Sequence, residues 1–341
     1  MFGLTDNSSK RISEIELMRF VAAFLILCCH MNGTTNYGWI AVEFFFIHSG
    51  ILMAQSASRI LAEKKEINIG IETKNMLVKK IRGFLPYFII CLSIYPLYYF
   101  FRDGLVYFAQ DWDLLFVDAP EGMYFNLADG ILNQIPDYFL MMMGGFYVEN
   151  GLLNFATWFL SALIIGLLIV YPLYLWKKDT SRFVIMPLLF IFCIGILINT
   201  VSSLDVHVPW LTVIYAGILR AVGEIALGAF CYELCIRLKN TDLTKAGSAL
   251  ITIVKVLLVA VFLIWTFKGF PETKDFVMIF IIAAMLIIMY SEKGLCIPRG
   301  NKICIFLGAF SLPLFLLHSP IQRLFEDTYT QSWVWDHLYI V

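Results

Sequence analysis

Nine stretches of this 341-residue chain are strongly apolar, and each is long enough to enter a lipid bilayer as a helix. By residue number they are 14–31, 39–58, 84–101, 152–176, 183–202, 212–236, 248–267, 275–291 and 303–321. Only 15% of the residues are charged and 60% are hydrophobic, which excludes an ordinary soluble domain of this length. The sequence therefore predicts an all-α, polytopic integral membrane protein, with 1–341 forming a single membrane-embedded domain.

The distribution of lysine and arginine predicts how these helices are oriented. Eighteen of the 25 cations lie before the first stretch or in the loops after every second one, and such loops face the cytoplasm. We therefore expect a cytoplasmic N-terminus and a place in the inner membrane of a bacterial cell, with the lipid bilayer as a partner. The net charge of −1 and the lack of a basic tail do not indicate nucleic-acid binding.

Two segments leave the number of membrane helices open. The segment 102–151 carries eight acidic residues and an apolar patch at 138–143. If this patch crossed the bilayer, the basic loop 177–182 would lie outside, so we predict an external loop with an interfacial or re-entrant piece. The aromatic residues near 333–341 fit an interfacial anchor or the start of a tenth helix. The expectation is nine to ten helices around a central polar cavity.

Ionisable residues in the first two stretches predict where that cavity lies, because charged groups are costly in hydrocarbon unless they have partners or line a polar space. Arg19 and His30 are eleven residues apart, which places them on one helix face and about 16 Å apart along the axis. Glu43 lies near the start of the next stretch and is expected at nearly the depth of His30. A carboxylate beside an imidazole orients it and raises its basicity, as a general base requires. A buried polar pair that merely joins two helices is the alternative.

Other polar residues are candidates for the walls of the same cavity. Lys79, Lys80 and Arg82 precede the third stretch and form either a topogenic cluster or a phosphate-binding site. Lys255 is expected to extend its amine to the membrane surface. The eight cysteines have no histidine pair nearby, so we expect no metal site. The remaining candidates, all in predicted membrane helices, are His48, Ser49, Trp158, Arg220, Glu224 and His318.

With these residues in place, the chain resembles the membrane-bound acyltransferase 3 family. Arg19-X10-His30 matches the first-helix signature of that family, and Val-Glu-Phe-Phe-Phe-Ile-His-Ser-Gly at 42–50 is similar to its second-helix motif. Lys79-Lys-Ile-Arg82 stands where the family has an R-x-x-R pair, and 220–228 and 307–320 are similar to later motifs. Lys79 departs from the pattern, because lysine keeps the charge of arginine but loses its bidentate geometry.

The resemblance implies acyl transfer across the bilayer. Acetyl-CoA would be the donor, with its phosphates bound by Lys79, Lys80, Arg82 and Arg19. His30, oriented by Glu43, would deprotonate a hydroxyl of a cell-surface or lipid-linked saccharide, either in a direct transfer or with an acyl-His30 intermediate. The residues expected to contact substrate are His48, Ser49, Trp158, Arg220, Glu224 and His318. Two alternatives are a small-molecule or lipid acceptor at the same site, and a transporter or flippase.

Overall fold

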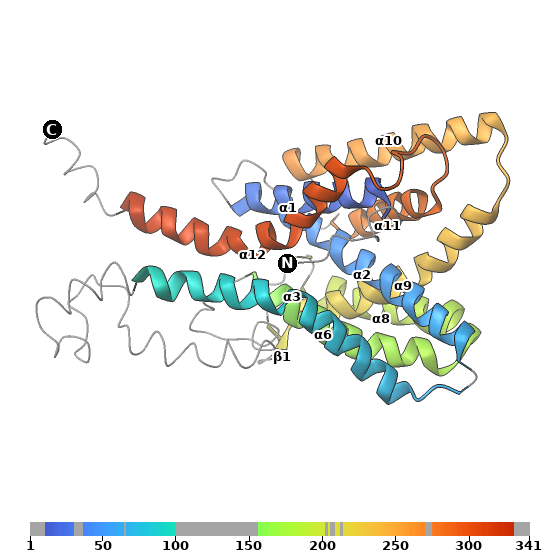
Figure 1. Ribbon diagram of the computed structural model, residues 1–341, viewed down its shortest axis with the longest axis horizontal. Coiled ribbons are helices and arrows are strands. Elements are labelled where there is room, and N and C mark those ends of the chain that lie inside the picture. The colour runs from blue at the N-terminus through green and yellow to red at the C-terminus, as the bar shows by residue number, and fades with distance from the viewer. Residues whose placement is uncertain are drawn as a thin grey trace, which may run out of the picture.

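The computed structural model of the protein describes residues 11–30, 37–64, 66–99, 156–201, 204, 209–211, 214–269 and 275–330, which are almost entirely helical (Figure 1). The helices are α1 (Ser13–His30), η2 (Gly38–Ala41), α2 (Val42–Glu63), α3 (Ile69–Tyr99), α6 (Thr157–Trp176), α7 (Lys178–Thr180), η6 (Ser181–Ile185), α8 (Met186–Thr200), α9 (Ala216–Asn240), α10 (Lys245–Lys268), α11 (Phe276–Ser291) and α12 (Lys302–Thr330). Before α9, β1 (Pro209–Leu211) pairs with β2 (Ile214–Tyr215) in an antiparallel ladder. Each of the nine apolar stretches coincides with a helix over most of its described residues. The predicted external loop 102–151 and the segment 333–341 lie outside the described residues.

Among the described helices, five are long and apolar enough to cross a membrane. They are Gly38–Glu63, Thr157–Trp176, Ser181–Thr200, Lys245–Lys268 and Lys302–Gln322, and the shorter Phe276–Ser291 is also apolar. Large apolar side chains on the outer faces of α8 and α10 are exposed, such as Phe192 at 66% and Leu250 at 61%. An exposed apolar surface of this kind fits contact with lipid hydrocarbon. The chain is therefore a multi-pass membrane protein.

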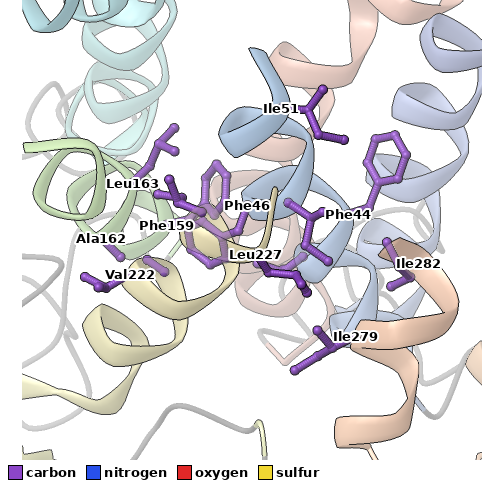
Figure 2. Close-up of a cluster of buried hydrophobic side chains, with 14 of the residues drawn as sticks. Phe44, Phe46, Ile51, Phe159, Ala162, Leu163, Val222, Leu227, Ile279 and Ile282 are labelled. Carbon is purple, nitrogen blue, oxygen red and sulfur yellow. The ribbon is translucent and has the colours of Figure 1, made fainter. Parts of the chain in front are cut away.

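Helix α2 lies in the middle of the bundle and contacts α1, α6, α9 and α11 (Figure 1). Its aromatic side chains point in different directions (Figure 2). Phe46 packs against Phe159 of α6, with ring centroids 4.7 Å apart, and Phe44 lies on the side of Ile282 of α11. Because α2 is covered from several sides, polar groups on this helix are removed from lipid and have to be satisfied by neighbouring helices.

Glycines allow the closest helix contacts. Gly50 of α2 faces Gly228 of α9, and a Cβ atom on Gly50 would stand 2.9 Å from the Gly228 Cα atom and collide with the Ile225 carbonyl. Gly308 of α12 lies against α1 in the same way, since a Cβ atom there would stand 2.9 Å from the Glu16 Cβ atom. Small residues at such crossings let backbones approach, which is how membrane helices gain packing energy without a hydrophobic driving force.

Short polar side chains fix where several helices begin. Asn68 Oδ1 accepts a hydrogen bond from the Ile71 amide at 3.1 Å at the start of α3, and Thr244 Oγ1 accepts one from the Gly247 amide at 3.1 Å at the start of α10. Asn301 Oδ1 accepts from the first amides of α12. Each cap satisfies backbone donors that a helix leaves unpaired at its N-terminus.

The Gly50–Gly228 crossing predicts a sharp dependence of stability on side-chain size. Gly228→Ala should lower the free energy of unfolding by about 1–3 kcal/mol, because the added methyl group meets the α2 backbone. Thermal unfolding of the purified protein in detergent would measure the effect. Gly195→Ala in α8 is the matched control, since a Cβ atom there has nothing within 4 Å and alanine favours a helix. Equal unfolding temperatures for the two variants would contradict this account of the crossing.

Candidate active site

A cavity of about 700 Å³ lies between α1, α2, α3, α6, α11 and α12. Along α2 its wall runs from Arg59 to Phe45, which is fourteen helical residues or about 21 Å. The volume falls within the range of natural small-molecule sites. The cavity is therefore long enough to hold an extended ligand parallel to α2.

One end of the cavity is strongly cationic. Six positive side chains line it, with Glu16 the single acidic residue among the lining residues of the described part; the six are Arg11, Arg19, Arg59, Lys79, Lys80 and Arg299. Glu16 Oε2 lies 2.8 Å from Arg19 Nη1, and Glu16 Oε1 lies 3.9 Å from Arg11 Nη1. Within the described part of the chain, no carboxylate pairs with Arg59, Lys79 or Lys80. The excess of positive charge suits an anionic ligand that carries several charges.

The loop between α11 and α12 builds part of this cationic end, and it is tied to the start of α1. Ser13 Oγ donates to the Pro298 carbonyl at 2.6 Å and accepts from the Asn301 amide at 3.0 Å. Glu14 accepts from the Ile297 amide at 3.2 Å and from Lys255, whose Nζ atom is 2.8 Å and 2.9 Å from the two carboxylate oxygens. Lys255 is buried here, whereas the sequence predicted an amine at the membrane surface. A buried charge needs such a partner.

Within the same loop, Arg299 is held by Glu292. The guanidinium donates hydrogen bonds to both oxygens of the Glu292 carboxylate, and Lys239 Nζ lies 2.5 Å from one of them. These hydrogen bonds, Arg299 first, lower the pKa of Glu292 to about 2, so the carboxylate stays charged at neutral pH. Arg299 thus takes a fixed position in the cavity wall.

Halfway along the cavity, polar groups interrupt the apolar wall. His48 Nδ1 and Tyr290 Oη are 2.8 Å apart, and the His48 ring stacks on Phe44 with centroids 5.7 Å apart. His48, Ser49, Tyr290 and Ser311 line the cavity at this level. The hydrogen bond fixes the orientation of the imidazole, which is what a ring that contacts a ligand requires.

Away from the cations, near the N-terminal ends of α2 and α9, Arg220 forms a buried ion pair with Glu43. Arg220 Nε donates to Glu43 Oε2 at 3.0 Å, Nη2 donates to Oε1, and Nη1 donates to the Leu204 carbonyl at 3.1 Å. The guanidinium lies 5.9 Å from the ring centroids of both Trp39 and Trp158. Glu224 Oε1 is 3.5 Å from Arg220 Nε. The predicted residues Glu43, Trp158, Arg220 and Glu224 therefore form one cluster.

His30, the last residue of α1, meets His318 in the middle of α12. The rings of His30 and His318 stack with centroids 4.9 Å apart, and His318 Nδ1 donates a hydrogen bond to the Phe315 carbonyl. With its proton on Nδ1, neutral His318 keeps an unprotonated Nε2 atom. The predicted contact between His30 and Glu43 stays a prediction. In chemical terms the His30–His318 pair offers a proton acceptor at the end of the bundle away from the cations.

The predicted phosphate-binding residues are placed unequally. Lys79, Lys80 and Arg19 line the cavity, whereas Arg82 is exposed and does not. Sequence reasoning missed Arg59, although a signal exists: Arg59 follows His48 by eleven residues, the same spacing as Arg19 and His30, and shares its helix face. No local signal marks Tyr290, Arg11 or Arg299, because tertiary packing brings them to the cavity.

The buried ion pair makes a thermodynamic prediction. Arg220→Gln should destabilise the protein by about 3–5 kcal/mol, because Glu43 would be left charged and buried without its partner. Glu43→Gln combined with Arg220→Gln should be less destabilising than Arg220→Gln alone, since the uncompensated charge is removed. A double-mutant cycle on unfolding in detergent measures the coupling. Additive effects of the two substitutions would contradict an energetic role for this pair.

Comparisons with known proteins place the chain in a family. A family model described as an acyltransferase domain matches residues 12–341, which cover nearly the whole chain. Comparisons with curated proteins and with solved structures found no match. The match confirms the resemblance carried by the first-helix and second-helix motifs. The chain therefore belongs to the membrane-bound acyltransferase 3 family and is a membrane acyltransferase.

Proposed function

We propose that the protein transfers an acetyl group from cytoplasmic acetyl-CoA to a hydroxyl of a cell-surface or lipid-linked saccharide. The observation that carries this proposal is the cavity itself, which is cationic at one end and lined by aromatic rings at the other. CoA has phosphates at one end and its thioester at the other, so its polarity follows that of the cavity. The family supplies the reaction type, and the cavity supports the donor.

The donor phosphates would lie among the cations. Arg59, Lys79 and Lys80 are the first candidates, because no carboxylate of the described residues competes for them. Arg19, Arg11 and Arg299 would contribute from the other side of the cavity, although each already has an acidic neighbour. Arginine and lysine both bind phosphate oxygens with charge-assisted hydrogen bonds. The pantetheine arm would then follow α2 past His48 and Ser49.

His30 would act as the general base on the acceptor. It takes the hydroxyl proton while the oxygen attacks the thioester carbon, the new C–O bond forms, and the C–S bond breaks to release CoA thiolate, which is then protonated. Glu43 would orient His30, since a carboxylate that accepts from Arg220 still has lone pairs for a second donor. Trp158, Arg220, Glu224 and His318 would contact the acceptor. An acyl-His30 intermediate is the variant of this mechanism.

The proposed topology puts donor and acceptor on opposite sides of the membrane. All nine apolar helices would cross the bilayer, with the N-terminus in the cytoplasm of a bacterial cell. Arg11, Arg59, Lys79 and Arg299 then face the cytoplasm, where acetyl-CoA is made. His30 and Glu43 then lie toward the outer side, where the saccharide is exposed.

Loss of the proposed base should abolish transfer without loss of donor binding. His30→Ala should lower transfer by about 10²- to 10⁴-fold. Radioactive acetyl-CoA added to inverted membrane vesicles, followed by counting of label in the saccharide fraction, measures transfer. Binding of acetyl-CoA to the purified variant should stay within about twofold of the natural protein. Transfer that survives in His30→Ala would refute the role of His30 as general base. Label that appears only in lipid or small molecules would refute the saccharide acceptor.

Lys80 predicts a pH dependence of donor binding. Lys80 lies on α3 before its apolar stretch, and burial, followed by the nearby Arg19 charge, lowers its pKa to about 8. The lysine is charged below this pH and neutral above it, so acetyl-CoA affinity should fall by about tenfold between pH 7 and pH 10. Lys80→Arg should bind acetyl-CoA with little change over this range. Parallel pH profiles for both proteins, measured by equilibrium binding at fixed salt, would exclude Lys80 as a phosphate ligand.

A further inference from the structure

Three phenylalanine rings line the cavity at the end opposite the cations: Phe45, Phe159 and Phe315, which together form the phenylalanine wall. Each is the last lining residue at that end of its helix, on α2, α6 and α12 respectively. Their ring centroids are 6.0 Å (Phe45–Phe159), 6.2 Å (Phe45–Phe315) and 5.1 Å (Phe159–Phe315) apart. These separations are typical of tilted and edge-to-face aromatic contacts. The rings therefore pack on one another as a continuous apolar surface.

The phenylalanine wall lies next to the two stacked histidines. The Phe315 ring centroid is 5.6 Å from that of His318, which in turn stacks on His30. His318 is 2% exposed, and neither histidine lines the cavity that the described residues enclose. Phe46, which does not line the cavity, packs against the Phe159 ring (Figure 2). A group that reaches this end of the cavity thus meets the rings of the wall.

We propose that the phenylalanine wall is the seat of the donor's acyl group and restricts the donor to short acyl chains. This inference rests on the proposed function, since it assumes a CoA thioester with its phosphates on the cations. From there the thioester extends along α2 toward Phe45, about 21 Å away, and its acyl carbons come to rest on the rings. A methyl group gains contact with them, whereas each further methylene needs space that close-packed rings already fill.

Phe315 is the most informative wall residue, because it contacts both the other two rings and His318. Replacement by alanine removes the ring on the side of the histidines and leaves space for several methylene groups. Phe310 of the same helix is 48% exposed and pairs with Phe306 away from the cavity, so Phe310→Ala is the matched control. Both substitutions remove a phenyl ring, but only Phe315→Ala removes it from the phenylalanine wall.

The experiment is competition binding to the purified full chain in lipid nanodiscs. Tritiated acetyl-CoA is displaced by acetyl-CoA, butyryl-CoA or hexanoyl-CoA. In the natural protein and in Phe310→Ala, hexanoyl-CoA should bind about tenfold or more weakly than acetyl-CoA. In Phe315→Ala this ratio should shift by at least about tenfold in favour of hexanoyl-CoA. If Phe315→Ala fails to fold, Phe159→Ala replaces it with the same expected shift.

The outcomes separate the two proposals. If the natural protein binds acetyl-CoA and hexanoyl-CoA equally well, or if the folded wall variant keeps the natural ratio, the phenylalanine wall is not the acyl seat while the donor cavity stands. If the folded natural protein binds none of the thioesters, the proposed function itself is wrong. A shift in Phe310→Ala as large as that in Phe315→Ala would also overturn the assignment, because it would not be specific to the wall.

Discussion

A doubly hydrogen-bonded ion pair, Arg220 with Glu43, is the contact on which the end of the bundle away from the cations depends. It joins α2 and α9, the helices whose backbones also meet at Gly50 and Gly228. In a low-dielectric interior a guanidinium and a carboxylate are tolerated only when each satisfies the other, and the planar fork of arginine does this with two parallel bonds. The glycine contact brings the helices close enough for that geometry, and the ion pair fixes their register.

Away from this pair, cationic and apolar side chains occupy opposite ends of the cavity. The cations gather where α1, α2 and α3 have their polar ends, and the rings gather where α2, α6 and α12 approach the histidines. The same α2 helix supplies a wall residue at one end and Arg59 at the other. A ligand with a charged head and an apolar tail is thereby oriented by the fold before any specific contact with the reacting group is made.

The helices could be predicted from the sequence because hydropathy is a local property, and within the described residues each predicted apolar stretch coincides with a helix. The partners of polar residues are not local. Both oxygens of Glu43 accept from Arg220, which is 177 residues away in the chain. Lys255 was expected at the membrane surface, yet Glu14 holds it in a buried site. Hydropathy gives the depth of such residues, whereas helix packing determines which side chains meet.

The loop between α11 and α12 illustrates what this tertiary pairing achieves. Ser13, Glu14 and Lys255 hold its backbone, and Glu292 holds Arg299. An anion that enters the cavity therefore meets a preorganised surface and does not have to order a segment of chain. Little of the interaction energy between anion and cavity is then lost in ordering the loop, so more of it contributes to affinity. Electrostatic attraction between the anion and the cations raises the association rate, and added salt weakens this attraction.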